Sequence, residues 1–150
     1  MVSIIMGSTS DMPLAEKTQK VLDDFSVEYD TQVLSAHRMP KRLVDYVSGL
    51  RDRGYKVVIC IAGLAAHLPG VVAAHTALPV IGVPVGGGPL SGIDALLSIA
   101  QMPKGVPVAT MAIGSHGATT AALFAIRIKS LQEPELADRL DTYIEEMNNR

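Results

Sequence analysis

The sequence predicts an α/β fold in which helices cover both faces of a five-stranded parallel sheet. Short runs rich in β-branched residues alternate with helix-length segments along the chain. Apolar residues crowd these runs instead of alternating with polar ones, as in strands that are buried on both faces. The length, 150 residues, suits a single domain with one core. Because buried strands joined by helices form a parallel sheet, the prediction is a flavodoxin-like three-layer α/β/α sandwich over residues 1–150.

Each predicted element follows from a short segment of the sequence. Four strand-like runs are rich in β-branched residues, and a weaker fifth run joins them: 2–6, 56–62, 78–85, 106–113 and 27–35. Helix-length segments lie between the runs, at 11–25, 39–54, 67–77, 91–102 and 117–131. Asp11 is the expected N-cap of the first helix, and Gly54 is the expected stop of the second. A last amphipathic helix is predicted at about 133–148.

Composition narrows the classes of function. Charged residues make up 19% of the chain and the formal net charge is −2, with no basic tract, so neither nucleic acid nor a membrane surface is an expected partner. No apolar stretch has the length of a membrane span. Cys60, the single cysteine, lies in an apolar run and is expected to be a reduced core residue. These features predict a cytoplasmic protein, and the hydrophobic fraction of 48% indicates burial between the subunits of a homo-oligomer.

The predicted topology places the functional site at one edge of the sheet. In open α/β sheets, ligands bind outside the carboxyl ends of the strands, near the point where the strand order reverses. The segments that follow the first four strands are MGSTSD at 6–11, SAHRMP at 35–40, AGLAAHLPG at 62–70 and VGGGPLSG at 85–92. Candidate functional residues are therefore expected in these four loops.

The loop after the first strand combines small residues with hydroxyl groups. Ser8, Ser10 and Asp11 lie where a strand ends and a helix begins, and the amide groups of a helix start favour a phosphate. Asp11 has the wrong charge for a phosphate, but its carboxylate could accept hydrogen bonds from sugar hydroxyls. Capping of the helix by Ser10 or Asp11 would explain the same residues without a ligand. The motif alone leaves both interpretations open.

The loop after the second strand places Ser35, His37 and Arg38 close together. Arginine offers a fork of donors that fits a phosphate, and histidine is the usual proton carrier near neutral pH. Because adjacent side chains there diverge in direction, His37 and Arg38 are expected to have different roles. Packing of the loop histidine beside a solvated arginine remains the alternative.

Three further histidines lie later in the chain. His67 follows the third strand among small residues, including Gly63, in a loop that could lie against a flat ligand. His75 is interpreted as structural, and His116 follows the fifth strand at the same edge of the sheet. No pair of histidines has the spacing of metal ligands on a helix, so no metal site is expected.

Five segments, taken in order, resemble a known enzyme family. They are MGSTSD, SAHRMP, AAHLPG, LPVIGVPV and LSGIDALLSIAQMPKGVPVATMAIG, and they span nearly the whole chain. Together they resemble class I N(5)-carboxyaminoimidazole ribonucleotide mutase of de novo purine biosynthesis. The resemblance implies a nucleotide-binding catalytic domain that moves a carboxyl group from the exocyclic nitrogen to the ring carbon of its substrate. It implies decarboxylation, retention of the CO2 and recarboxylation, with no ATP, metal or organic cofactor, in a homo-octamer.

The resemblance also implies a role for each candidate residue. His37 matches the histidine that handles the proton on the reacting ring carbon or carboxylate, and His67 matches the histidine beside the base and the CO2 pocket. Asp11 matches the position that binds the ribose hydroxyls, and Arg38 the position that binds the phosphate. The other matches are binding or supporting positions near the substrate: Ser8, Ser10, Ser35 and Gly63.

The chain departs from the family pattern around the predicted base pocket. Leu64 stands where the family usually has glycine, and residues 86–89 replace a loop that usually begins with glutamine and serine. The segment around His116 also differs. Three alternatives therefore stay open: a class II carboxylase that uses free CO2, a related carboxylase for another nucleotide, and a nucleotide-binding sensor of the same fold.

The predicted C-terminal helix could pack on a neighbouring subunit.

Overall fold

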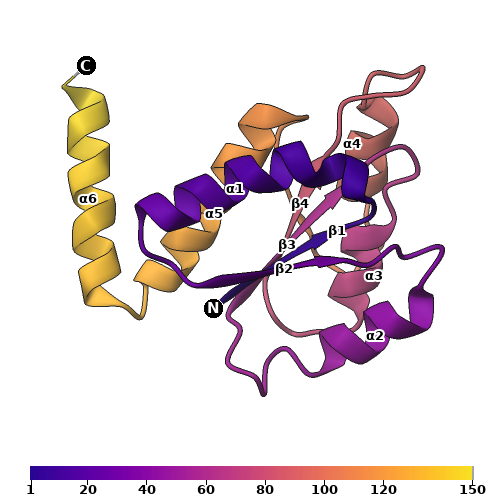
Figure 1. Cartoon of the computed structure of the whole chain (residues 1–150), viewed down its shortest axis with the longest axis horizontal. Helices are drawn as coiled ribbons and strands as arrows, with labels where there is room; N and C mark the ends of the chain where they lie inside the picture. The colour runs from indigo at the N-terminus through magenta and orange to yellow at the C-terminus, as the bar shows by residue number, and fades with distance from the viewer. Residues whose placement is uncertain (150) are drawn as a thin grey trace.

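The computed structural model describes residues 1–149, and its five strands form one parallel sheet in the order β2-β1-β3-β4-β5. Helices cover both faces of this sheet (Figure 1). The order is that of a flavodoxin-like sheet, in which the chain passes from one side of β1 to the other after β2. The predicted fold class is confirmed.

The burial of each strand follows its hydrophobic pattern. β1 (Val2–Met6), β3 (Val57–Ala62) and β4 (Val80–Pro84) are buried along their whole length, as expected for central strands that are covered on both faces. β2 (Tyr29–Val33) is half-buried at one edge of the sheet. β5 (Ala109–Thr110) forms the other edge.

The two faces of the sheet carry separate hydrophobic cores. α1 (Met12–Asp24), α5 (Ser115–Ser130) and α6 (Pro134–Asn148) belong to one face, with α6 packed against α5. α2 (Pro40–Ser48), α3 (Leu68–Ala74) and α4 (Ile93–Ala100) cover the other. Successive residues of β1 supply both cores, since Ile4 points to the first and Ile5 to the second. Cys60 is fully buried in the second core, as predicted, and burial raises the pKa of its thiol.

Several element boundaries differ from the predicted ones. The fifth strand is much shorter than the run 106–113, since only Ala109 and Thr110 pair with β4. Pro107 lacks a backbone N–H and limits pairing at the start of the run. The second helix ends at Ser48, before turns that reach Gly54 in a left-handed conformation (φ 84°). The last helix of the sheet layer begins at Ser115, two residues before the predicted start at 117.

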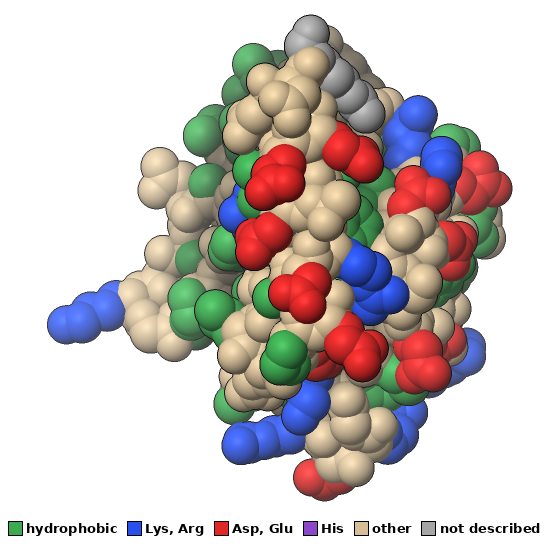
Figure 2. Space-filling view, turned by 90° about the vertical axis from the view of Figure 1, so that its left-hand side faces the viewer, with side chains coloured by type: hydrophobic (Ala, Val, Ile, Leu, Met, Phe, Trp, Pro, Cys, Tyr) green, Lys and Arg blue, Asp and Glu red, His purple; other side chains and the backbone are tan. Residues whose placement is uncertain are grey.

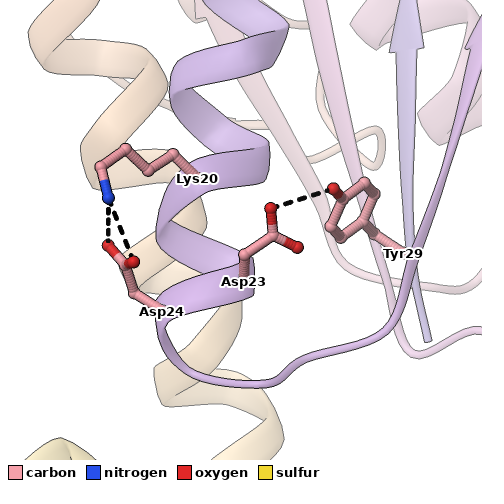
Figure 3. Close-up of polar contacts among 4 residues, drawn as sticks. All are labelled: Lys20, Asp23, Asp24 and Tyr29. Carbon is pink, nitrogen blue, oxygen red and sulfur yellow. Dashed lines mark hydrogen bonds and ion pairs between the residues drawn. The ribbon is translucent and has the colours of Figure 1, made fainter.

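The end of α1 is connected to β2 by polar contacts at the surface (Figure 3). The Tyr29 hydroxyl donates a hydrogen bond to the Asp23 carboxylate at 3.3 Å. Lys20 and Asp24 form an ion pair at 3.1 Å, one helical turn apart. Since these groups are exposed to water, each contact adds less than about 1 kcal/mol to stability.

The C-terminal helix α6 lies at one side of the molecule (Figure 1). On the face that includes it, acidic side chains are prominent (Figure 2). Such a surface is unfavourable for binding a polyanion. The exposed acidic residues of α6 are Glu135, Asp138, Asp141, Glu145 and Glu146.

Within residues 1–149, no helix is both long and apolar enough to cross a membrane.

Candidate active site

Loops at the carboxyl edge of the sheet line an open cavity of about 640 Å³. The loops after β1, β2 and β3 supply most of its wall, because these strands are neighbours in the order β2-β1-β3. The segment after β4 completes the wall with Val85 and two glycines. Every candidate site residue of the sequence analysis lines this cavity: Ser8, Ser10, Asp11, Ser35, His37, Arg38, Gly63 and His67.

Ser8 organises the loop after β1. It is the N-cap of a short 3-10 helix, η1 (Thr9–Asp11), and its hydroxyl oxygen accepts a hydrogen bond from the Ser10 N–H at 3.4 Å. The Ser10 hydroxyl lies 3.0 Å from the same oxygen. Asp11 occupies the N-cap position of α1, as predicted, but its side chain makes no capping hydrogen bond there. The side-chain oxygen that caps this region is that of Ser8, before η1, and not that of Ser10.

Asp11 is a buried carboxyl group at the wall of the cavity, with 8% of the residue exposed. Burial raises the pKa of this carboxyl. Hydrogen bonds from the Ser8 backbone and the Ser10 hydroxyl, and the positive charge of Arg38, oppose this effect without cancelling it. A carboxylate that is only partly compensated in this way is well suited to accept further hydrogen bonds from a ligand.

Arg38 connects the loops after β1 and β2. Its backbone N–H donates to the Ser35 hydroxyl at 3.2 Å, so the buried serine fixes the turn that precedes α2. Its guanidinium donates to the carbonyl oxygen of Gly7 at 3.0 Å. A guanidinium has five N–H donors, so others remain to bind an anion in the cavity. The structure therefore brings Arg38 beside Ser8, Ser10 and Asp11 at one end of the cavity.

His37 and His67 form a hydrogen-bonded pair. Nε2 of His37 lies 2.8 Å from Nδ1 of His67, and the two rings meet edge to face with their centroids 4.9 Å apart. One of these nitrogens must carry the hydrogen and the other a lone pair, since two protonated nitrogens would repel each other. The pair therefore joins two residues 30 positions apart into one unit that can hold and pass on a proton.

Part of the cavity wall comes from residues in the predicted loops to which the sequence assigns no role. Leu64 and Val85 line the cavity together with Gly87 and Gly88. The sequence shows Leu64 and the glycine run only as departures from a family pattern. Their place in the wall depends on the backbone, because Leu64 adopts a left-handed conformation (φ 53°) that no pattern of residue types indicates.

The remaining histidines lie outside the cavity wall. His75 hydrogen-bonds through Nδ1 to the Val71 carbonyl oxygen at 2.8 Å, one turn back on α3, in agreement with a structural role. His116 is exposed in the first turn of α5. Among residues 1–149, no group of three or more His, Cys, Asp or Glu side chains is placed to hold a metal ion.

Comparisons with known proteins match this arrangement to a family. The sequence matches the family described as AIR carboxylase over residues 1–150. Two curated relatives are named N5-carboxyaminoimidazole ribonucleotide mutase. The protein of Pyrococcus abyssi is 53% identical over 97% of this chain and 83% of the relative, and that of Bacillus subtilis is 52% identical over 94% and 87%. The crystal structure of Treponema denticola PurE has a TM-score of 0.90 and 33% identity, and the match covers 99% of this chain and 91% of that one. The chain belongs to the AIR carboxylase family.

Proposed function

We propose that this protein is an isomerase of purine biosynthesis that converts N5-carboxyaminoimidazole ribonucleotide to 4-carboxy-5-aminoimidazole ribonucleotide. The names of the curated relatives support this activity. The observation that carries the proposal is the His37–His67 pair in a cavity that also contains Arg38 and Asp11. Such a cavity combines a proton carrier with groups that suit the phosphate and the ribose of a nucleotide.

The phosphate end of the substrate is proposed to bind beside Arg38. Its guanidinium supplies positive charge, and the hydroxyls of Ser8 and Ser10 lie on the facing loop. Asp11 accepts hydrogen bonds from the ribose hydroxyls. The dianionic phosphate can thus supply binding energy at a distance from the reacting carboxyl group.

The base is proposed to lie along the loop after β3. Gly63 keeps this loop in close contact with the loop after β4, because a Cβ at that position would be 3.1 Å from Cβ of Val85. Ser35 supports the site indirectly through the backbone of Arg38. The nucleotide then reaches from Arg38 at one end of the cavity to the histidine pair.

The carboxyl shift requires one proton to be delivered and one to be removed. Cleavage of the nitrogen–carbon bond releases CO2 and returns the electron pair to the exocyclic nitrogen, which takes up a proton. The electron pair of the ring carbon then forms a bond to the carbon of CO2, and the hydrogen on the ring carbon leaves as a proton. His37 can donate the first proton and accept the second, while His67 orients its ring and shares the proton.

The test is turnover of the N5-carboxylated nucleotide with and without added bicarbonate, followed by ultraviolet absorbance. A mutase is expected to turn over at the same rate in both conditions, and to remain active in the presence of a metal chelator. Turnover that requires bicarbonate would establish a carboxylase instead. Binding of the nucleotide without turnover would establish a sensor and overturn the proposal.

The role of His37 is tested by His37→Asn, which keeps a polar group of similar size. Loss of general acid–base catalysis is expected to lower kcat by about 10² to 10⁴. KM for the nucleotide is expected to change less than threefold or so, because the phosphate contact comes from Arg38. A variant that retains full kcat would contradict the assignment.

We also propose that the protein is a cytoplasmic homo-octamer, as the family resemblance implies. Support comes from large apolar side chains on the surface of the single chain, among them Leu90, Ile93 and Leu97, each more than half exposed. Sedimentation measures the mass directly. An octamer of this 15.9 kDa chain is expected at about 127 kDa, and a mass near that of one chain would contradict the proposal.

A further inference from the structure

Leu64 combines two unfavourable features in the loop that carries His67. Its side chain is 57% exposed, and its backbone is left-handed with φ 53°. A left-handed conformation is strained for any residue with a Cβ, and an exposed leucine gains little from burial. Strained residues of this kind cluster at functional sites, where the surrounding structure holds them in place.

The side chain of Leu64 lies against Gly88 in the wall of the cavity. A Cβ built on Gly88 would lie 2.7 Å from Cδ2 of Leu64, so the methyl group occupies the space that a side chain at position 88 would need. Leu64 belongs to the loop after β3 and Gly88 to the segment after β4, and both line the cavity. The contact therefore joins two loops of the cavity wall.

The backbone that strains Leu64 also positions the histidine pair. The Ala66 N–H donates to the Leu64 carbonyl oxygen and the His67 N–H donates to the Ala65 carbonyl oxygen, both at 2.8 Å. These two tight turns fix the segment between Leu64 and His67. The apolar side chain on Gly88 and the imidazole beside His37 are thus held by one short, rigid stretch of chain.

We propose that Leu64, seated on Gly88, is a specificity-determining residue that retains the CO2 released during the carboxyl shift. This inference rests on the proposed mutase activity. CO2 is small and uncharged and donates no hydrogen bonds, so an apolar wall that excludes water is what can hold it near its acceptor carbon. Escape of CO2 competes with formation of the new carbon–carbon bond, and Leu64 lowers escape without touching the phosphate end of the substrate.

The test measures exchange of CO2 with the solution. The unlabelled N5-carboxylated nucleotide is converted in buffer that contains ¹³C-bicarbonate, and the label in the product is measured by mass spectrometry. The unmodified protein is expected to incorporate little label, and Leu64→Ala several times more per turnover, with KM for the nucleotide within about twofold. Leu131→Ala, at an 84% exposed leucine after α5, is the matched control and is expected to behave like the unmodified protein.

Three results separate failure of this inference from failure of the proposed activity. Full labelling of the product by the unmodified protein would overturn the mutase activity itself. Little labelling by both the unmodified protein and Leu64→Ala would leave the mutase intact and overturn the role of Leu64. Equal increases in Leu64→Ala and Leu131→Ala would also overturn it.

A second pair of substitutions tests the contact with Gly88. Gly88→Ala is expected to displace the Leu64 side chain and to raise label incorporation, whereas the same change made together with Leu64→Ala is expected to add little. Gly54→Ala is the control, since Gly54 shares the left-handed backbone (φ 84°) but has no atom within 4 Å of a built Cβ. Independent, multiplicative effects of the Gly88 and Leu64 substitutions would contradict the contact.

Discussion

Asp11 is a single residue at which stability and binding oppose each other. Its carboxyl group is buried, and burial raises its pKa. The native pKa therefore lies above the unfolded value, so the native state holds the proton more tightly. Tighter binding of the proton stabilises the native state. This stabilisation is fully present below the unfolded pKa and is lost as the pH rises through the native pKa. Near neutral pH this stabilisation is absent, so the buried Asp11 carboxyl lowers the free energy of unfolding of the free protein while it remains available to bind a ligand.

Asp11→Asn is accordingly expected to raise the free energy of unfolding near pH 7 and to weaken substrate binding. The amide cannot ionise, so the gain in stability should vanish at a pH well below the unfolded pKa. Loss of a charge-assisted hydrogen bond to the ribose, worth about 1.5–3 kcal/mol, raises KM roughly 10- to 100-fold. Urea unfolding at several pH values and steady-state kinetics measure both effects. A variant less stable than the parent near pH 7 would contradict the argument.

At the scale of elements, Asp30 of β2 accepts hydrogen bonds from α2, from β2 itself and from the segment before β3. The Tyr46 hydroxyl of α2 donates to the Asp30 carboxylate at 2.9 Å, and that of Tyr55 at 3.3 Å. The Gln32 amide donates to the same carboxylate at 3.0 Å. Burial alone would raise the pKa of Asp30, but these hydrogen bonds outweigh it and lower the pKa. Since α2 begins directly after the loop of His37, this attachment also supports the site.

Asp30→Asn is expected to destabilise the protein by about 1–2 kcal/mol near pH 7. The native pKa lies below the unfolded value, so the stability from ionised Asp30 is present above the unfolded pKa and is lost as the pH falls through the native pKa. The difference between parent and variant should therefore narrow towards about pH 3. Chemical denaturation at both pH values measures it. Asp45→Asn is the control, because the ion pair of Asp45 with Lys41 is exposed.

Gly82 of β4 sets the distance between the sheet and α4. A Cβ at this position would lie 2.4 Å from Cγ2 of Ile99 on α4, and 3.3 Å from Cβ of Pro69 on α3. Only a residue without a side chain lets these helices approach so closely. The strand that contains Gly82 ends in the loop of the cavity wall, so this packing also determines where that loop lies.

Gly82→Ala is expected to cost about 1–3 kcal/mol of stability, because the added methyl group overpacks the core. Thermal or urea unfolding measures the loss. Ile99→Leu removes the branching methyl and is expected to recover part of it, with a non-additive double-mutant cycle. Gly87→Ala is the control for stability, since no atom lies within 4 Å of a Cβ built there. A tolerated Gly82→Ala would show that α4 can move away from the sheet at little cost.

How far the sequence predicted each element depended on how local its determinants were. β1, β3 and β4 are buried along their whole length, and their apolar runs were sufficient to place them. β5 was overestimated, because pairing at the edge of a sheet depends on prolines and on its single neighbour rather than on β-branched residues. The candidate site residues follow strand ends, and all of them line the cavity, while their roles stay predictions. The contact of Leu64 with Gly88 depends on backbone conformation in two separate loops, which residue types alone do not specify.

At the scale of the whole molecule, large apolar side chains remain exposed on α4 and just before it. Ile93 is 56% exposed and Leu97 51%, and their spacing of four residues places them in a row on one side of the helix. Leu90, 59% exposed, lies in the segment that leads into α4. Isolated apolar side chains are common on surfaces, but a row at helical spacing is typical of a contact between subunits. α4 follows the loop of Gly88, so an interface there would also stabilise one wall of the cavity.

The double substitution Ile93→Asp and Leu97→Asp is expected to dissociate the proposed oligomer. Two charges in an apolar contact would have to lose their hydration on association, which costs several kcal/mol per charge and is not repaid without partners. Sedimentation should then give a mass well below that of the unmodified protein, and circular dichroism should show a retained fold, since both side chains are exposed in the single chain. Leu131→Asp, at an exposed leucine outside this row, is the control and should keep the full mass. A double variant of unchanged mass would mean that the subunits associate through another surface, such as the apolar cleft between α5 and α6 that Phe124 and Met147 line.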